Sequence, residues 1–271
     1  MEALRFVEGW PAGRAAVGVV DAERELGAVG PQGETFSWAS VTKLLTAVAV
    51  LVALEEGTVE LEHPVGPTGA TLRHVLAHAS GLPLNDGPPI APVGQRRIYS
   101  NSGIQAAATY LEERAGMPFK EYLDHAVLKP LGLQGDLRLS PAWGYAGPLV
   151  DLLAVGRELL APTLVAAETL AEATELQFPG LVGVLPGFGR RDPNDWGLGF
   201  ELRDAKSPHW TGMTNSPRTF GHFGASGTFL WVDPEAGLAC ACLTDHEFGD
   251  WSKAAWPELS DAVLAEAGEV G

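Results

Sequence analysis

Ser40 and Lys43 place a hydroxyl and an amine three residues apart at the start of an apolar segment, FSWASVTKLLTAVAV (residues 36–50). Positions i and i+3 share one face of a helix, so the lysine amine can reach the serine hydroxyl. Burial and the positive end of the helix dipole both disfavour a charged lysine and lower its pKa toward that of a working base. We therefore interpret Ser40 as a nucleophile activated by Lys43, with the Ser40 backbone N–H as an oxyanion donor. The structural alternative is a helix cap at Ser40 with Lys43 extending to solvent.

A phenol and a carboxamide lie two residues apart in IYSNSGIQ (residues 98–105). Tyr99 is the only tyrosine of the chain that has asparagine at the second position after it, here Asn101. A phenol that donates or accepts a proton, beside a carboxamide, suits proton shuttling and substrate positioning. The alternative is a plain helix start at which Asn101 or Ser102 serves as the cap.

Three glycines punctuate the segment TFGHFGASGTFLWVD (residues 219–233). Glycine in a strand allows the backbone to approach a ligand closely, so this segment is a candidate wall of a binding site. Glycine-rich bends without any ligand also occur in sheets.

Four further side chains invite functional readings. His74 and His78 stand at i and i+4, a spacing compatible with a metal, but no glutamate accompanies them in an H-E-x-x-H pattern, so we interpret them as packing or capping residues and expect no metal. His209 and Trp210 either line a pocket or belong to the core. No serine lies in a G-x-S-x-G pattern, which argues against an α/β-hydrolase.

The elements that must position these residues alternate between strand and helix patterns. A helix that is apolar all round, and hence buried, is predicted from Val41 to Leu54. Further helices are expected at 71–79, 101–116, 119–128 and 147–160, and after Trp256. Strands are expected at 15–21, 25–30, 196–202, 226–233 and 238–244. We expect the strands of the two chain ends to form one sheet.

Composition limits the class of partner. The chain has 271 residues, 46% of them apolar, and a formal net charge of −16 without a Lys/Arg run. A real core is therefore expected, and neither nucleic acid nor an anionic membrane suits this charge, which leaves a small-molecule substrate as the expected partner. No segment is long enough to span a bilayer, and the N-terminus lacks a signal-peptide pattern. Cys240 and Cys242 are badly spaced for a disulfide, which favours a reduced, cytoplasmic location.

The motifs S-x-x-K, Y-x-N and H-x-G, in this order, resemble those of the serine β-lactamase and penicillin-binding-protein superfamily, in particular its class C β-lactamase and family VIII esterase-like branch. The likeness continues through LRHVLAHASGLP (72–83), the long segment 99–133 and GHFGASGTFLWVDPEAG (221–237). The resemblance implies an α/β (α+β) fold in which an antiparallel sheet from both chain ends, residues 1–60 and 195–271, is flanked by helices and carries a mainly helical insertion, residues 61–194. It implies no cofactor.

The resemblance also assigns roles. It implies Ser40 as the acyl-accepting nucleophile, Lys43 as its base and Tyr99 as the proton shuttle. It further implies that Asn101 positions the substrate carbonyl or amide and that the Ala225 N–H is the second oxyanion donor. The substrate-binding strand that is Lys-Thr-Gly in the family corresponds here to His222, Phe223 and Gly224.

The histidine in that strand sets the expected substrate class. A histidine of ordinary pKa is mostly neutral near neutral pH, so His222 lacks the permanent cation with which the family holds a substrate carboxylate. We therefore expect a carboxylesterase that acts on small neutral esters or amides. The alternatives are a D-Ala-D-Ala carboxypeptidase or a β-lactamase and, from another class, a non-catalytic ligand-binding or sensor module.

Overall fold

A six-stranded antiparallel sheet joins the two ends of the chain in the computed structural model, which describes residues 1–270. Its strand order is β2-β1-β11-β10-β9-β8. The strands are β1 (Ala15–Val20), β2 (Glu25–Val29), β8 (Glu201–Leu202), β9 (Phe220–Gly224), β10 (Thr228–Asp233) and β11 (Leu238–Thr244). β1 pairs with β11 from Ala15 opposite Thr244 to Val20 opposite Ala239. The predicted antiparallel sheet built from both chain ends is thus confirmed.

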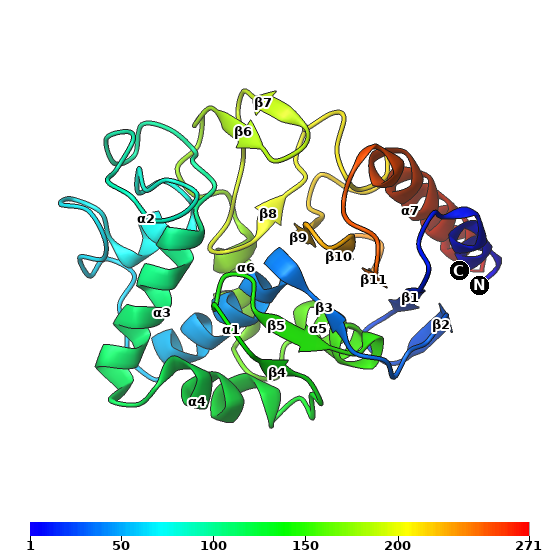
Figure 1. Ribbon diagram of the computed structural model, residues 1–271, viewed down its shortest axis with the longest axis horizontal. Helices are drawn as coiled ribbons and strands as arrows, with labels where there is room; N and C mark the ends of the chain where they lie inside the picture. The colour runs from blue at the N-terminus through cyan, green and yellow to red at the C-terminus, as the bar shows by residue number, and fades with distance from the viewer. Residues whose placement is uncertain (271) are drawn as a thin grey trace.

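Two hydrophobic cores lie on opposite faces of this sheet because successive side chains of a strand alternate between its faces. In β1, Val17 and Val19 face the core formed with α7 (Asp250–Val270) and the 3-10 helix η1 (Glu2–Gly9). Ala16 and Val20 face the other core, which contains the remaining helices. Figure 1 shows α7 beside the blue N-terminal helix at one end of the molecule and the other helices beyond the sheet.

The other helices surround a central one. They are α1 (Thr42–Glu55), α2 (Leu72–Leu76), α3 (Asn101–Ala115), α4 (Phe119–Leu123) with the π-helical turn η3 (Asp124–Leu128), α5 (Leu149–Leu160) and α6 (Ala167–Thr174). Two small sheets complete the fold: β3 (Phe36–Ser37), β5 (Tyr145–Gly147) and β4 (Asp136–Leu137), and the hairpin of β6 (Gly183–Leu185) and β7 (Gly189–Arg191). α1 is buried at nearly every position, as its sequence predicts, and lies among its helical neighbours in Figure 1.

The observed elements differ from the predicted ones at several places, among them η1 and the short strands β3 to β7, which were not predicted. α2 ends at Leu76, short of residue 79, and the chain soon turns through left-handed backbone at His78 (φ 55°). The expected strand 196–202 forms regular strand only at β8. α6 was not predicted, and α7 begins at Asp250 and continues through Pro257. No helix within residues 1–270 is long and apolar enough to cross a membrane.

The division into a discontinuous sheet domain, 1–60 with 195–271, and an insertion, 61–194, stays a prediction. α5 belongs by sequence to the inserted range, yet it packs against β1, β10 and β11 of the large sheet. Gly18 of β1 shows how close this contact is, because a Cβ there would lie 2.9 Å from a Leu153 methyl group.

Candidate active site

The Lys43 amine lies at the centre of the residues that the sequence singled out. Its Nζ lies 3.2 Å from Ser40 Oγ, 2.7 Å from Asn101 Oδ1 and 2.8 Å from the Ala142 carbonyl oxygen, so an uncharged amine can donate to the last two and accept from the Ser40 hydroxyl. The side chain is completely buried, so the alternative in which it extends to solvent is wrong. All three partners are neutral, and burial lowers the pKa of Lys43 well below its ordinary value of 10.5. This environment favours an uncharged amine next to the serine hydroxyl.

Ser40 sits on a single 3-10 turn, η2 (Ala39–Val41), that leads directly into α1. The end of β9 and the start of β10 pack against Trp38, just before this turn. Thr228 Oγ1 donates to the Trp38 carbonyl at 2.9 Å, and a Cβ on Gly224 would lie 2.6 Å from the same carbonyl oxygen. Only glycine fits such a close approach. The contact places Gly224, the residue before Ala225, against the turn that carries Ser40. The pairing of the Ser40 and Ala225 N–H groups as oxyanion donors stays a prediction.

The ring of Tyr99 packs against the same amine. Lys43 Nζ lies 4.7 Å from the centre of the Tyr99 ring, and the phenol oxygen lies 3.5 Å from His222 Nε2. Burial raises the pKa of Tyr99 above its ordinary value of 10.0, against a smaller lowering from a hydrogen bond with Ser40. Tyr99 is therefore a neutral phenol near neutral pH, with a proton available for donation.

Asn101 is held at both ends of its carboxamide, with Oδ1 on Lys43 and Nδ2 donating to Asn85 Oδ1 at 3.1 Å. Ser100 caps α3, since its hydroxyl accepts from the Gly103 N–H at 2.9 Å and donates to the Pro83 carbonyl at 2.6 Å. The motif does start a helix, as the alternative reading held, but the cap is Ser100 rather than Asn101 or Ser102. The capping by Ser100 leaves the Asn101 side chain free to meet Lys43.

The neighbouring residues His222 and Phe223 point to opposite faces of β9, as alternation requires. His222 Nδ1 lies 2.7 Å from the Phe223 carbonyl, which can only accept, so Nδ1 carries the proton and Nε2 presents a lone pair toward Tyr99. Burial lowers the pKa of His222 to about 3. The Phe223 ring instead packs in the core on the other face, 4.9 Å from the ring of Phe248.

The remaining candidates lie apart from one another. His74 Nδ1 accepts from the Thr71 N–H at 3.3 Å, and its ring stacks on Phe178 at 4.4 Å. His78, by contrast, packs its ring against Tyr99 at 4.9 Å. The two histidines of the i, i+4 pair therefore share no common ligand position.

His209 and Trp210 belong to the core. Both are buried, and both hydrogen-bond to the same carboxylate oxygen, Glu201 Oε2, at 2.9 and 2.8 Å. The pocket-lining alternative for these two residues is therefore not supported by their positions.

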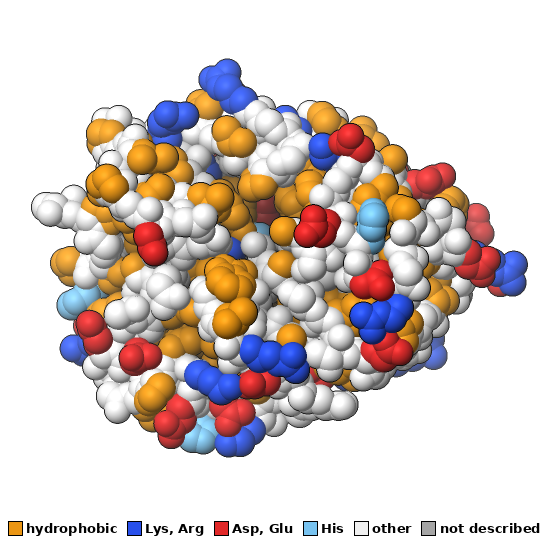
Figure 2. Space-filling model, in the orientation of Figure 1, with side chains coloured by type: hydrophobic (Ala, Val, Ile, Leu, Met, Phe, Trp, Pro, Cys, Tyr) orange, Lys and Arg blue, Asp and Glu red, His pale blue; other side chains and the backbone are white. Residues whose placement is uncertain are grey.

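The sequence did not predict the loop that carries the Ala142 carbonyl, nor the exposed apolar side chains next to the site. Trp143 directly follows this carbonyl and is 41% exposed, while Leu84, 47% exposed, accepts the Asn101 N–H on its carbonyl at 2.7 Å. Trp143 and Leu84 thus belong to two different loops, each of which has a backbone carbonyl bonded to a residue of the site. Figure 2 shows a hollow near the centre of this face with hydrophobic side chains around it. A backbone acceptor has no signature in the sequence, so the loop could not have been found from residue types.

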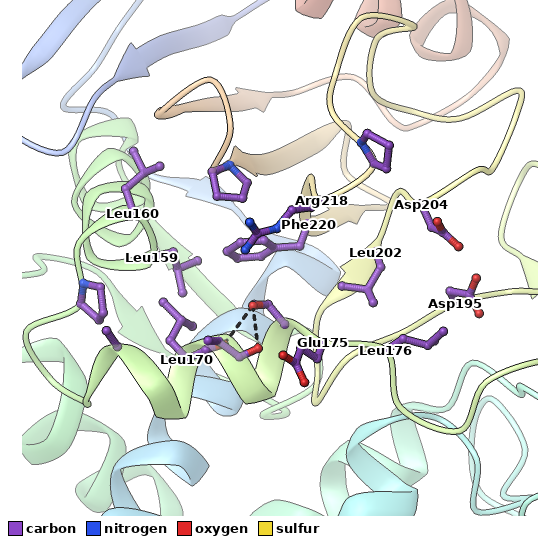
Figure 3. Close-up of a pocket in the computed structure, with 16 residues that line it drawn as sticks. Leu159, Leu160, Leu170, Glu175, Leu176, Asp195, Leu202, Asp204, Arg218 and Phe220 are labelled. Carbon is purple, nitrogen blue, oxygen red and sulfur yellow. Dashed lines mark hydrogen bonds between the residues drawn. The ribbon is translucent and has the colours of Figure 1, made fainter.

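A cavity of about 520 Å³ lies elsewhere, between α5, α6, β8 and β9. Leucine and phenylalanine side chains form its walls, and Asp195 and Asp204 lie together at one edge (Figure 3). Its lining contains none of Ser40, Lys43 and Tyr99. It is a separate feature from the site around Ser40.

Comparison with known proteins gives the class of this fold and site. The sequence profile of the Beta-lactamase family matches residues 6–265, so the chain belongs to that family. It is 49% identical to a solved β-lactamase from Mycobacterium bovis, with 98% of this chain and 99% of that chain covered and a TM-score of 0.96.

Two more distant relatives share the fold or part of the sequence. EstCE1, described as a hydrolase with promiscuous acyltransferase activity, has 17% identity and a TM-score of 0.80 over 97% of this chain and 96% of its own. Penicillin-binding protein 4* of Bacillus subtilis (strain 168) is 26% identical in an alignment 153 residues long, with 41% of this chain and 34% of that protein covered. The match thus spans about a third of that curated relative.

Proposed function

We propose that this chain is a serine hydrolase that forms an acyl-enzyme on Ser40 and prefers small neutral esters or amides. One observation carries the proposal: a fully buried lysine, bonded only to neutral partners, lies 3.2 Å from a serine hydroxyl at the start of a helix. Such a lysine is a base rather than a counter-ion. A non-catalytic binding module has no need of this arrangement.

In the proposed reaction, neutral Lys43 takes the Ser40 proton while Oγ attacks the carbonyl carbon of the ester. The carbonyl oxygen becomes an oxyanion that accepts from the backbone N–H groups of Ser40 and Ala225. The tetrahedral intermediate then breaks its bond to the alcohol, whose oxygen takes the Tyr99 proton, and Lys43 returns a proton to the phenol. A water molecule repeats the attack on the acyl-enzyme, releases the carboxylic acid and restores Ser40.

The proposed preference for neutral substrates rests on His222 and on the exposed apolar side chains of Leu84 and Trp143. A pKa near 3 keeps His222 uncharged, and its Nδ1 already donates to the Phe223 carbonyl. A substrate carboxylate would therefore lose a charge-assisted hydrogen bond that is typically worth about 1.5–3 kcal/mol. The exposed apolar side chains of Leu84 and Trp143 beside the site suit an uncharged acyl or alcohol group.

Labelling with a fluorophosphonate, followed by peptide mapping, tests the nucleophile. We expect the label on Ser40 and none on Ser40→Ala. Ser226→Ala is the matched control, because Ser226 lies nearby but its hydroxyl donates to the Ser37 carbonyl at 3.1 Å. A label on Ser226, or none on the folded protein, would overturn the assignment.

Turnover of a panel separates the substrate classes. Relative to nitrocefin, benzylpenicillin or a D-Ala-D-Ala peptide, p-nitrophenyl acetate and butyrate should show kcat/KM at least about tenfold higher, the factor that corresponds to about 1.4 kcal/mol. The 49% identity to a protein described as a β-lactamase favours β-lactam hydrolysis as the second candidate. Faster turnover of a β-lactam than of either ester would establish that candidate instead.

A further inference from the structure

His78 occupies a backbone conformation that a histidine rarely adopts. Its φ is +55°, in the left-handed region that favours glycine, and it lies just after α2 rather than at a loop tip, with only 1% of its surface exposed. Conformational strain of this kind persists where the surrounding structure over-determines it, and it gathers at functional sites. The contacts of His78 therefore merit a functional explanation.

His78 contacts Tyr99 and both of its neighbours in the chain. The His78 carbonyl accepts from the Ile98 N–H at 2.8 Å, and ring nitrogen Nδ1 accepts from the Ser100 N–H at 3.2 Å. The ring itself packs on the Tyr99 ring at 4.9 Å, with the planes 55° apart. The residues before and after Tyr99, and its own side chain, are thus all fixed by one histidine.

The protonation state of His78 follows from these bonds. Because the Ser100 N–H donates to Nδ1, the neutral ring carries its proton on Nε2, which has no hydrogen-bond partner within residues 1–270. Burial lowers the pKa of His78 well below 6.5. Trp196 closes the other side of the ring, with its plane nearly perpendicular at 4.6 Å. The ring is therefore held as an uncharged acceptor between two aromatic side chains.

We propose that His78 is a positioning residue that fixes the Tyr99 phenol between Lys43 and His222 through the Nδ1 hydrogen bond to Ser100, an inference that rests on the proposed function of Tyr99. The left-handed backbone is what allows one residue to place both its carbonyl and its ring nitrogen against the same short segment. A histidine that only filled space would need neither this conformation nor this tautomer.

Three substitutions separate the acceptor from the volume of the ring. His78→Asn places Oδ1 where Nδ1 lies and tolerates a positive φ better than most residues. His78→Gln moves the acceptor one bond further from the backbone, and His78→Leu removes it. We expect kcat for p-nitrophenyl acetate to fall at least about tenfold in His78→Leu and His78→Gln, with KM nearly unchanged, and to stay within about threefold in His78→Asn.

His74→Asn is the matched control, because His74 lies in the same segment but packs on Phe178 away from the site. Its kcat should equal that of the unsubstituted chain. A double-mutant cycle with Tyr99→Phe supplies the second test, since a residue that acts through Tyr99 has little further effect once the phenol is gone. Independent, additive losses of kcat would overturn the proposal, as would equal losses in the asparagine and leucine variants.

A spectroscopic readout keeps this test separate from the proposed function. The chain has four tyrosines, so fluorotyrosine labelling gives four ¹⁹F resonances, and Tyr99→Phe assigns one of them. That resonance should keep its position in His78→Asn and His74→Asn, and should move or broaden in His78→Leu and His78→Gln. An unmoved resonance would overturn the positioning role whether or not esters are turned over. Absence of Ser40 labelling in the unsubstituted chain would instead overturn the proposed function alone.

Discussion

Lys43 and Lys206 are both buried, yet their surroundings differ in charge. The Lys43 amine contacts a hydroxyl, a carboxamide oxygen and a carbonyl oxygen, all of them neutral. Lys206 donates to the carboxylate of Glu201 as well as to the carbonyls of Leu202 and Asp195. Burial lowers the pKa of both, but for Lys206 the charge of Glu201 and its hydrogen bond act in the opposite direction. Burial alone lowers the pKa of a lysine and favours the neutral amine, whereas a carboxylate counter-ion raises the pKa and favours the ammonium.

The Glu201 counter-ion offsets part of the effect of burial on Lys206, whose pKa is still lowered from 10.5. Two unit charges 4 Å apart interact with about 4 kcal/mol at an effective dielectric constant of about 20, which corresponds to about three pKa units. The same Glu201 carboxylate also accepts from His209 and Trp210, so the Lys206 cluster is fully hydrogen-bonded and structural. Lys43 has only neutral partners, and its neutrality is the feature that the proposed chemistry uses.

The largest expected effect separates the two lysines by the same substitution. Lys43→Met should lower kcat/KM by about 10³-fold or more, because the base is lost, while thermal stability changes little or rises. Lys206→Met should lower the free energy of unfolding by about 3–5 kcal/mol, because Glu201 remains as a buried charge without its ammonium. Steady-state kinetics and urea unfolding of both variants test this pair.

The comparison would break if Lys206→Met, while still folded, lost as much activity as Lys43→Met. It would also break if Lys43→Met were the less stable of the two. Lys253→Met is the control for the loss of one positive charge, since Lys253 pairs at the surface with a fully exposed Asp250 at 3.0 Å. Surface pairs of this kind contribute little, so both its activity and its stability should stay near the original.

A smaller effect is expected when Lys43 is given a counter-ion. Asn101→Asp would place a carboxylate where Oδ1 now lies, 2.7 Å from Lys43 Nζ. The pKa of Lys43 should rise toward that of a paired lysine, so that less of it is neutral near neutral pH. We expect kcat/KM to fall by about 10²-fold there and its ascending limb to move to higher pH.

Asn101→Ser isolates the loss of the carboxamide from the gain of charge. It should lower kcat/KM without moving the ascending limb of the pH profile. If the ascending limb of the pH profile of kcat/KM does not move in Asn101→Asp, Lys43 is not the group whose ionisation controls the rate.

Local spacing explains which parts of the site the sequence could predict. Ser40 and Lys43 are three residues apart, so local helical geometry brings them together. Tyr99 and Asn101 stand at the entry to α3, and each reaches Lys43. Only the resemblance joined these pairs to His222, which lies 123 residues from Tyr99. Family membership and the antiparallel sheet from both chain ends are confirmed.

Long-range backbone contacts explain what the sequence could not predict. The Ala142 carbonyl acts through the main chain, which every residue shares, and it is 99 residues from Lys43. Adjacent residues of a strand face opposite ways, so His222 and Phe223 could not both direct side chains to the site, and the structure assigns the site face to His222. The left-handed turn at His78 depends on its contacts around Tyr99, so helical periodicity extended α2 too far.

The smallest effect concerns the acid stability of the buried histidines. Burial lowers the pKa of His78, His209 and His222, the last to about 3 from 6.5. Below pH 6.5 these histidines are protonated in the unfolded chain but stay neutral in the folded chain. The free energy of unfolding therefore falls as pH falls, by up to about 1.4 kcal/mol per pH unit for each histidine. Asp195 opposes this between 6 and 3.8, because its raised pKa of about 6 makes the folded state take up a proton first. Glu201, with a pKa lowered from 4.5 to about 2, adds its own loss of stability only below pH 4.5.

Between pH 6.5 and 4.5 the histidines therefore dominate, and urea unfolding across this window should show that the free energy of unfolding declines toward acid pH. His222→Gln should make the slope shallower by about 1.4 kcal/mol per pH unit, whereas His125→Gln, at a surface position, should leave it unchanged. Equal slopes in all three proteins would mean that His222 is not held neutral in the folded state.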